Sequence, residues 1–430
     1  MRTVGILTLG CKVNTYESEY VANEFIKRGY ELTSFDNLDS DIYVINTCTV
    51  TNTSDQKSRK MIRQARAKNK NAVVVAMGCF TQIRSNDNAI MDYIDIVIGN
   101  NKKSKIVDLV EEYINNKQKI VNIKDIKDEQ FDDMEIKHFN TRTRALVKIE
   151  DGCENYCSYC IIPYVRGKVR SKDPKKVIDE VNRLVSNGYK EIVLTGIHTG
   201  HYGSDLHDYD FSDLLLELEK INGLDRIRIS SIEITELNDK FLNVLKKSKK
   251  IVDHIHIPLQ AGSNHILKLM NRKYDKDYYI NKISKIRTIR PDIAITTDVI
   301  VGFPSESDSD FNETLDFVKE VNFAGGHVFP FSKRNGTLAA KMNGQLTKEE
   351  KHIRCKKLIS LFDTLEDDYY KKHINSVVTV IAETYDNGYL TGHSSNYLKV
   401  KFKGCENLLG KEVNVKIQSM ETKLLIGEML

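Results

Sequence analysis

Short apolar runs alternate with amphipathic stretches along most of this chain, and that alternation constrains its fold more than any other feature. In residues 1–115 the helical patterns Thr15–Arg28 and Ser104–Ile114 lie between and after such runs. The runs, which we expect to form strands, are Thr3–Thr8, Ile42–Asn46, Val73–Met77 and Ile94–Ile98. Strands that alternate with helices indicate a parallel sheet covered by helices on both faces.

The same alternation resumes at Ala145 with longer units. Helical patterns include Lys175–Ser186, Asp275–Ile289 and Asp308–Val321, and a long helix is expected at Lys348–Asn375. The expected strands are Ala145–Ile149, Glu191–Thr195, Arg226–Ser231, His254–Pro258, Ala294–Val301 and His327–Phe331. Six strand–helix units of this kind suit a full or partial barrel, which the long helix would close.

The last part of the chain changes character. Residues 376–430 contain short strand patterns joined by turns, which indicate a small β-barrel of the OB type. Residues 117–143 are charged and lack Gly and Pro, as is typical of a linker. We therefore predict an α/β chain with a parallel-sheet domain in residues 1–115, a linker in 116–138, a barrel domain in 139–370 and a small β-barrel in 371–430.

The charge of the chain is nearly balanced, with 64 Lys and Arg against 60 Asp and Glu. Any nucleic-acid site must therefore be a local patch. No apolar run approaches the roughly 20 residues of a membrane span, and the N-terminus lacks a signal-peptide pattern. We expect a cytoplasmic protein with no membrane partner, in which the eight cysteines form no disulfides and those that cluster serve metal binding or catalysis. Cys355 and Cys405, which stand outside the clusters, are expected not to bind metal.

Three cysteines form a C-x3-C-x2-C motif directly after the strand pattern that ends at Ile149. They are Cys153, Cys157 and Cys160. Three thiolates on one loop can hold three irons of a [4Fe–4S] cluster and leave the fourth iron open to an outside ligand. A structural zinc site would need a fourth protein ligand, and no Cys or His stands close by in the sequence. Three unrelated thiols or a zinc site are the alternatives.

Three further cysteines each follow an expected strand of the first sheet. They are Cys11, Cys48 and Cys79, and Gly10 and Gly78 precede two of them. Because ligand sites form at the carboxyl ends of parallel strands, these thiols are expected to meet at one edge of the sheet. They predict a second three-cysteine [4Fe–4S] cluster, with three buried or reactive thiols as the alternative.

The loop Asp151–Cys160, at the start of a six-unit domain, resembles the radical S-adenosylmethionine (SAM) enzymes. In that family SAM binds the open iron, and one electron from the cluster cleaves SAM to a 5′-deoxyadenosyl radical. Together with the second cysteine set and the C-terminal barrel, the chain resembles the radical SAM methylthiotransferases along nearly its whole length. Further matching segments are Cys160–Pro163 with Arg166–Gly167, Leu194–His198, Arg228–Glu233, His256–Gln260, Thr297–Pro304 and His327–Pro330.

Within that family, Leu9–Asn14 with Tyr16 and Glu17 resembles the bacterial enzymes that act on threonylcarbamoyladenosine. The resemblance implies conversion of N6-threonylcarbamoyladenosine at tRNA position 37 to its 2-methylthio derivative. It implies two [4Fe–4S] clusters, sulfur from the auxiliary cluster, and a second SAM as methyl donor. It also implies tRNA binding by the C-terminal barrel (a TRAM domain) and a flavodoxin- or ferredoxin-type electron donor. We expect a monomer.

Two alternatives to this function remain open on the sequence. One is the same chemistry on isopentenyladenosine in tRNA. The other is a non-catalytic iron–sulfur protein that binds RNA or carries electrons. The chain also departs from the family pattern at two expected turns: Ser305 stands where Gly is usual, and Asn335 where Pro is often found.

Five residues are expected near the cofactor. The resemblance implies that the segments of Gly196 and Gly302 line the SAM pocket, where glycine lets the backbone approach closely. Glu233 and Gln260, at expected strand ends, could face the cofactor or the adenosine. Tyr159 would lie beside the radical SAM cluster. The alternative for each is a structural role at the barrel mouth.

Basic residues gather at three places. Lys399, Lys401 and Lys403 alternate along one expected strand and so share a face, with Tyr389 and Tyr397 available to stack on bases. Residues 56–70 carry no acid, and a helix there would offer phosphates a positive face, a solvated helix being the alternative. The helix residues expected to bind RNA are Lys57, Arg59, Lys60, Arg63 and Arg66. The third group, expected near the cleft, is Arg166, Lys168, Arg170 and Lys172.

Overall fold

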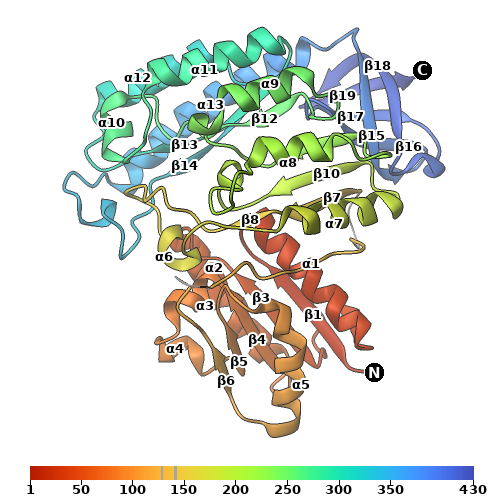
Figure 1. Cartoon of the computed structure of the whole chain (residues 1–430). Coiled ribbons are helices and arrows are strands. Elements are labelled where there is room, and N and C mark those ends of the chain that lie inside the picture. The colour runs from red at the N-terminus through yellow and green to blue at the C-terminus, as the bar shows by residue number, and fades with distance from the viewer. Residues whose placement is uncertain (127–128, 140–142) are drawn as a thin grey trace.

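The N-terminal part of the chain is a six-stranded parallel sheet (Figure 1). The computed structural model describes residues 1–126, 129–139 and 143–430. The strand order is β2-β1-β3-β4-β5-β6, and every neighbouring pair is parallel, as predicted. The strands are β1 (Thr3–Thr8), β2 (Glu31–Thr33), β3 (Ile42–Thr47), β4 (Val73–Gly78), β5 (Ile96–Ile98) and β6 (Ile120–Asn122).

Helices cover both faces of this sheet because its central strands are apolar on both sides. β3 and β4 are buried along their whole length. Apolar side chains of α1 (Lys12–Lys27) and α5 (Ile106–Asn116) pack on one face. The other face is covered by α2 (Asn52–Lys68), α3 (Cys79–Arg84) and α4 (Asn88–Met91).

Six parallel strands form the open barrel that follows. They lie in two three-stranded sheets, β11-β10-β7 and β12-β13-β14, and a parallel bridge between Ile227 and Ile251 joins the two. The partial barrel predicted from the sequence is confirmed. The strands are β7 (Arg144–Lys148), β10 (Glu191–Thr195), β11 (Arg226–Ile229), β12 (His254–His256), β13 (Ala294–Val301) and β14 (Gly325–Pro330).

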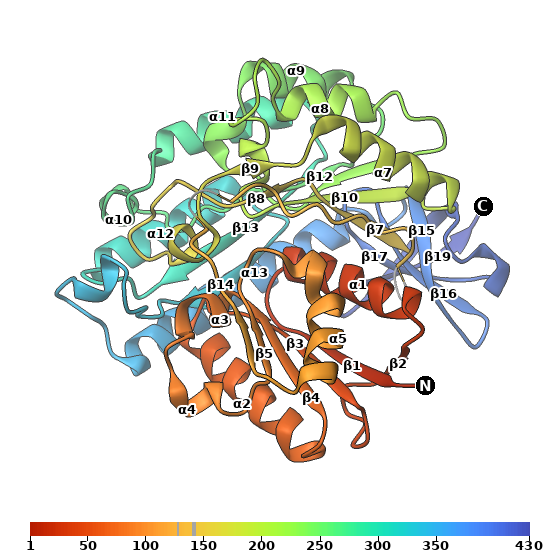
Figure 2. The same cartoon turned by 60° about the horizontal axis from the view of Figure 1, so that its bottom comes forward.

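Helices line the outside of the barrel (Figure 2). They are α7 (Pro174–Ser186), α8 (Phe211–Leu218), α9 (Asp239–Lys247), α10 (Asn264–Leu269), α11 (Lys276–Ile289) and α12 (Asp308–Val321). The long α13 (Lys348–Lys371) packs against β14. It begins with a capping box between Thr347 and Glu350. It ends four residues before the predicted Asn375, where the chain turns through a left-handed conformation.

The radical SAM motif lies between short elements at the barrel mouth. β8 (Glu150–Asp151) pairs with β9 (Arg170–Ser171) in antiparallel fashion, and the cysteine loop and α6 (Ile162–Arg166) lie between them. Figures 1 and 2 both draw this region next to the carboxyl ends of the N-terminal sheet. The fold therefore brings the two cysteine-bearing regions together.

The C-terminal part is a closed five-stranded barrel of order β15-β16-β17-β19-β18. Its strands are β15 (Val377–Asp386), β16 (Tyr389–Ser394), β17 (Lys399–Lys403), β18 (Glu412–Glu421) and β19 (Leu424–Met429). Arg226 of β11 attaches it to the larger barrel, since its guanidinium donates to Glu412 at 2.7 Å and to the carbonyl of Thr379 at 2.7 Å. The small β-barrel predicted from the turn pattern is confirmed.

The stretch expected as a linker contributes to both neighbouring parts. Ile120–Asn122 form β6 at the edge of the sheet, paired with β5. Met134, Ile136 and Phe139 are buried in the core of the larger barrel. Residues 127–128 of the expected linker, and residues 140–142 of the expected barrel domain, lie outside the described residues. The domain bounds stay a prediction.

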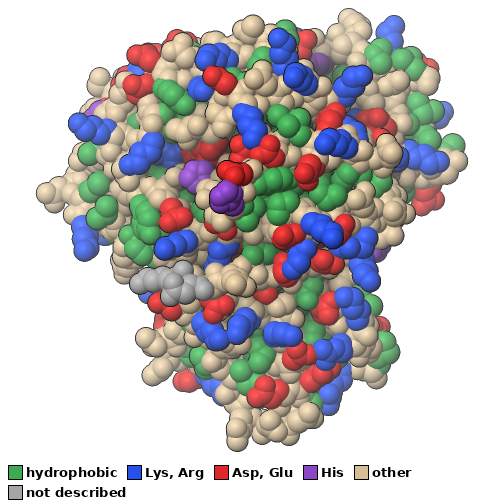
Figure 3. Space-filling model, viewed as in Figure 1, with side chains coloured by type: hydrophobic (Ala, Val, Ile, Leu, Met, Phe, Trp, Pro, Cys, Tyr) green, Lys and Arg blue, Asp and Glu red, His purple; other side chains and the backbone are tan. Residues whose placement is uncertain are grey.

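Positive and negative side chains are interspersed over the face of the molecule drawn in Figure 3. This agrees with the nearly balanced charge of the chain. No helix in the described part of the chain combines the length and the apolar character needed to span a membrane.

Candidate functional site

The C-x3-C-x2-C loop leaves β8 through a tight turn at Gly152. This glycine has φ +101°, and a Cβ there would meet the carbonyl oxygen of Lys168 at 1.9 Å, so no other residue fits. The three thiols beyond it are partly exposed. Burial and then the neighbouring Cys157 raise the pKa of the Cys160 thiol to about 12. The thiols are therefore close enough to influence one another, as ligands of one group must be.

Two N–H donors point at sulfurs of this loop. The guanidinium of Arg272 donates to Cys157 Sγ at 3.1 Å, and the backbone N–H of Ile162 donates to Cys160 Sγ at 3.4 Å. Arg272 also forms a buried ion pair with Glu233. Donors of this kind stabilise negative charge on the sulfurs, and thiolates are the form that binds iron.

His198, at the end of the segment after β10, lies against the same loop. Its Nδ1 is 3.7 Å from Cys153 Sγ, and its backbone N–H donates to Glu150 at 2.7 Å. Its Nε2 contacts the carboxylate of Glu236. Burial lowers the pKa of His198 to about 4 and raises the pKa of Glu236 to about 7. The imidazole is thus held in one orientation beside the cysteine.

Gly196 lies close to the buried carboxylate of Glu150, next to this loop. A Cβ at Gly196 would meet the Glu150 carboxylate at 2.6 Å. Glu150 is fully buried, and its Oε1 has no hydrogen-bond partner among the described residues. An unpartnered buried acceptor beside a glycine is what an amino group of SAM would require. The residues therefore fit a [4Fe–4S] cluster on Cys153, Cys157 and Cys160 with SAM next to it.

The second cysteine set meets at the carboxyl ends of β1, β3 and β4. Gly10 and Gly78 have φ +104° and +105°. A Cβ on Gly10 would come within 3.1 Å of Cys48 Sγ. Burial raises the pKa of Cys11 and of Cys48, and the Cys79 thiol contributes to both shifts. The three thiols therefore converge, although 68 residues separate the first from the last.

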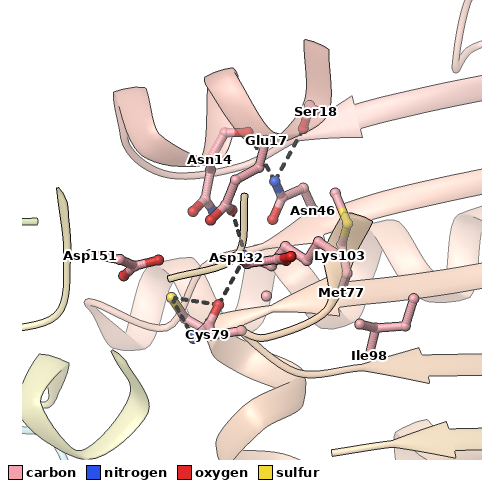
Figure 4. Close-up of polar contacts among 12 residues, drawn as sticks. Asn14, Glu17, Ser18, Asn46, Met77, Cys79, Ile98, Lys103, Asp132 and Asp151 are labelled. Atoms are coloured by element: carbon pink, nitrogen blue, oxygen red, sulfur yellow. Dashed lines mark hydrogen bonds and ion pairs between the residues drawn. The ribbon is translucent and has the colours of Figure 1, made fainter. Parts of the chain in front are cut away.

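Buried charges surround the Cys79 thiol (Figure 4). Arg166 donates through Nε to Cys79 Sγ at 3.3 Å and through Nη2 to Asn14 at 2.7 Å. The ion pairs join helix α1 of the sheet domain to the barrel. Their members are Glu17 and Asp151 as carboxylates and Lys103, Lys148, Arg166 and Arg170 as cations. These four cations exceed the two carboxylates by two, so this site favours an anionic group on the thiols, as a thiolate-ligated cluster is.

A cavity of about 960 Å³ extends between the sheet domain, the large barrel and the small barrel. Cys11 and Gly196 both line it. Further lining groups are Lys12, Arg144, Arg228, His254, Asp298 and Tyr397. The cavity thus connects the second cysteine set with the side of the barrel that adjoins the first set, and it is large enough for a nucleoside.

Of the five residues expected near the cofactor, Gly196 is the one that lines this cavity among the described residues. Glu233 instead pairs with Arg272, and the Tyr159 ring packs edge-on against Phe303 at 6.5 Å. Gln260 has φ +65°, and its backbone bonds with Asp298 and Ile300 hold it at β13. Gly302 has φ +69° and donates to Glu306. Cofactor contact by these residues stays a prediction.

The expected RNA-binding residues divide by their partners. On α2, Lys57, Lys60 and Arg63 are exposed. Arg59 and Arg66 are paired with Asp87 at 2.6 Å and Asp95 at 2.5 Å. On β17, Lys399 and Lys403 are exposed, and Lys401 lies over the Tyr389 ring at 4.8 Å.

The third basic group is not a surface patch. Arg166, Arg170 and Lys172 are buried, and Lys172 pairs with Glu180 at 2.6 Å. Arg166 lies at the second cysteine set, where it donates to Cys79. The short β8–β9 pair folds all three side chains into the interior, where they pair with carboxylates and offer no surface to phosphates. The left-handed φ of +65° at Ser305 explains why glycine is usual at that position.

Several residues of the site were missed by sequence reasoning. Arg272 and His198 reach the cysteine loop from positions 115 and 45 residues away, and no local pattern marks such contacts. Glu150 could have been found from the sequence. It is a carboxylate at the end of an apolar strand pattern, directly before the cysteine loop.

The chain matches two families, the radical SAM superfamily over residues 147–318 and the uncharacterized protein family UPF0004 over residues 3–99. It is 45% identical to the threonylcarbamoyladenosine tRNA methylthiotransferase MtaB of Bacillus subtilis (strain 168), over 97% of this chain and 94% of that protein. It is 39% identical to the protein of the same name from Aquifex aeolicus, over 96% of this chain and 100% of that protein.

Relatives of a second name are somewhat less similar. The tRNA-2-methylthio-N(6)-dimethylallyladenosine synthase of Thermoanaerobacter sp. (strain X514) is 37% identical, over 99% of this chain and 92% of that protein. Among solved structures, the radical SAM methyltransferase TsrM of Kitasatospora setae, with cobalamin and a [4Fe–4S] cluster bound, has the same fold. Its TM-score is 0.56 at 13% identity, over 76% of this chain and 75% of that chain. The chain belongs to the radical SAM methylthiotransferase family.

Proposed function

We propose that this protein is a tRNA methylthiotransferase that converts N6-threonylcarbamoyladenosine at tRNA position 37 to its 2-methylthio derivative. The observation that carries the proposal is the cavity that Cys11 and Gly196 share. A base held there has a sulfur-bearing group on one side and the SAM side of the barrel on the other. The Bacillus subtilis and Aquifex aeolicus relatives, 45% and 39% identical, bear the corresponding name.

Cys153, Cys157 and Cys160 would hold the radical SAM cluster, and Cys11, Cys48 and Cys79 the auxiliary cluster. With SAM bound, the clusters supply the radical and sulfur-transfer chemistry that an unreactive aryl C–H bond needs. The protein supplies the environment. Arg272 and the Ile162 N–H stabilise charge on Cys157 and Cys160, and Arg166 does so at Cys79.

The adenosine must leave its stack to enter a cavity between two domains, which suits a base in the anticodon loop. Lys57, Lys60 and Arg63 of α2 and the lysines of β17 would bind tRNA phosphates. A low-potential flavodoxin- or ferredoxin-type protein would supply electrons. We also propose that the protein works as a monomer in the cytoplasm.

Two cysteine variants test which cysteine set is needed for SAM cleavage and which for methylthiolation. The reaction contains anaerobically reconstituted protein, SAM, a reductant and an anticodon stem-loop that carries threonylcarbamoyladenosine. Cys11→Ala should abolish methylthiolation and leave SAM cleavage, whereas Cys157→Ala should abolish both. Cys405→Ala is the matched control, since Cys405 is exposed in the small barrel and should lose neither activity.

Two outcomes would contradict the proposal. Full product formation by Cys11→Ala would show that Cys11 is not a ligand of the auxiliary cluster. A fully loaded wild-type protein that forms neither deoxyadenosine nor methionine would instead support a non-catalytic iron–sulfur protein.

A further inference from the structure

Cationic side chains gather at one part of the cavity, around the ring of Tyr397. The guanidiniums of Arg228 and Arg144 lie 4.9 and 5.3 Å from the centre of that ring. His254 and His393 stack on the ring at 5.0 and 4.8 Å. Tyr397 has φ +69°, a strained conformation that persists only where its surroundings hold it in place.

Two buried nitrogens of this group lack partners. Arg228 is 4% exposed and pairs through Nε with Glu191 at 2.6 Å. Its Nη1, however, has no hydrogen-bond partner among the described residues, and neither has Nδ1 of His254, which is 8% exposed. Buried polar groups are almost always hydrogen-bonded. Two unpartnered nitrogens on residues that line one cavity therefore indicate that a polar ligand binds there.

Lys12 adds a charge without a fixed partner. It is exposed, lines the same cavity and directly follows Cys11. Within the described ranges, no carboxylate lies within 4 Å of its ammonium, whereas Arg144 is paired with Glu383 at 3.2 Å. The positive charge of Lys12 is therefore available to an anion inside the cavity.

The proposed substrate carries such an anion. The threonylcarbamoyl group on N6 ends in a free carboxylate, whereas a dimethylallyl group has no charge. C6, which carries N6, and C2 flank the same ring nitrogen of adenine, so a substituent on N6 can extend along the edge that receives sulfur at C2. The group that binds the carboxylate must then lie near the auxiliary cysteines, as Lys12 does.

We propose that Lys12 and Arg228 form a carboxylate-binding site that selects the threonylcarbamoyl substituent. This inference rests on the proposed function and deepens it, because it identifies residues that determine the choice of substrate. Lys12 is the residue to change, because Arg228 also bonds the carbonyls of Ser394 and Ser395 and its loss would disturb the barrel interface.

The test compares two stem-loop RNAs, one with threonylcarbamoyladenosine and one with its neutral methyl ester. Dissociation constants are measured by fluorescence anisotropy on the reconstituted holoenzyme without reductant. A charge-assisted contact predicts that wild type prefers the acid by about 10- to 100-fold. Lys12→Gln should lower this ratio by about 10-fold, to the preference that Arg228 alone retains, and Lys12→Arg should keep most of it.

The matched control is Lys27→Gln, because Lys27 is at the opposite end of α1 and pairs with Glu24. Its ratio should equal that of wild type. Each ratio is taken within one protein, so differences in cluster content cancel. An equal affinity of wild type for acid and ester, or an unchanged ratio in Lys12→Gln, would overturn the proposal. A wild-type enzyme that cleaves SAM but forms no product from the acid RNA would instead contradict the proposed function, whatever the ratio.

Discussion

At the scale of single residues, the contacts of the cysteines are made by atoms remote in sequence. Arg272, Ile162 and Arg166 each donate an N–H to a cysteine sulfur. Hydrogen bonds to ligating sulfurs tune the potential of a cluster. In the proposed assignment the cysteines bind the clusters, and these donors adjust the potential of the bound metal.

A change at Gly10 tests whether Cys11, Cys48 and Cys79 hold the auxiliary cluster. Gly10→Ala should lower the iron bound per protein by about half, because its Cβ would press on Cys48 within 3.1 Å. Iron and acid-labile sulfide assays on the reconstituted protein measure this, and SAM cleavage should survive.

Gly29→Ala is the matched control for that change. Gly29 also has a left-handed φ of +82°, but a Cβ there meets nothing within 4 Å. It should cost about 1 kcal/mol of backbone strain and leave the iron content intact. Equal iron in Gly10→Ala and Gly29→Ala would contradict the close approach of Gly10 to a ligand.

At the scale of elements, α2 carries both exposed cations, which we propose bind RNA, and cations that are paired with carboxylates of the fold. The triple change of Lys57, Lys60 and Arg63 to Gln should weaken tRNA binding and lower its salt dependence, because exposed cations release counterions from phosphates. Filter binding at several salt concentrations measures both. The pair Lys246→Gln and Lys247→Gln, exposed on α9, is the control. An unchanged salt dependence in the triple variant would remove α2 from the proposed tRNA surface.

Many elements could be predicted from the sequence because they are long or strongly apolar. β1, β10 and β13 have the expected bounds. β2 and β6 were missed, since three residues are too few to give a periodic signal, and pairing with the neighbouring strand stabilises them instead.

The candidate site, too, could be predicted only in part from the sequence. Cysteines at strand ends could be read from the sequence, because topology brings those ends together. Arg272, His198 and the buried charge of Arg166 could not, because their contacts depend on how the barrel and the sheet domain pack.

At the scale of the whole molecule, the buried ion pairs between α1 and the barrel connect the two cysteine-bearing domains. Burial opposes ionisation of Glu17, but Arg166, Lys103 and Lys148 outweigh it and hold the pKa of that carboxyl well below its usual range. Glu17→Gln would leave the buried cations with less compensation. It should cost about 3–5 kcal/mol of unfolding free energy, measured by denaturant unfolding.

Glu24→Gln, on the same helix, is the control for that variant. Glu24 pairs with Lys27 at the surface, so its loss should cost under about 1 kcal/mol. Equal stabilities of the two variants would contradict the role assigned to the buried network in joining the domains.

The central claim, that this protein methylthiolates threonylcarbamoyladenosine, is tested most directly on cellular tRNA. Digested tRNA from a strain that lacks the gene and from the complemented strain is compared by nucleoside mass spectrometry. We predict that 2-methylthio-N6-threonylcarbamoyladenosine disappears in the first, with its unmethylthiolated precursor accumulating, and returns in the second. An unchanged level of that nucleoside would contradict the claim, and loss of the methylthiolated isopentenyl nucleoside in the same spectrum would identify the other substrate.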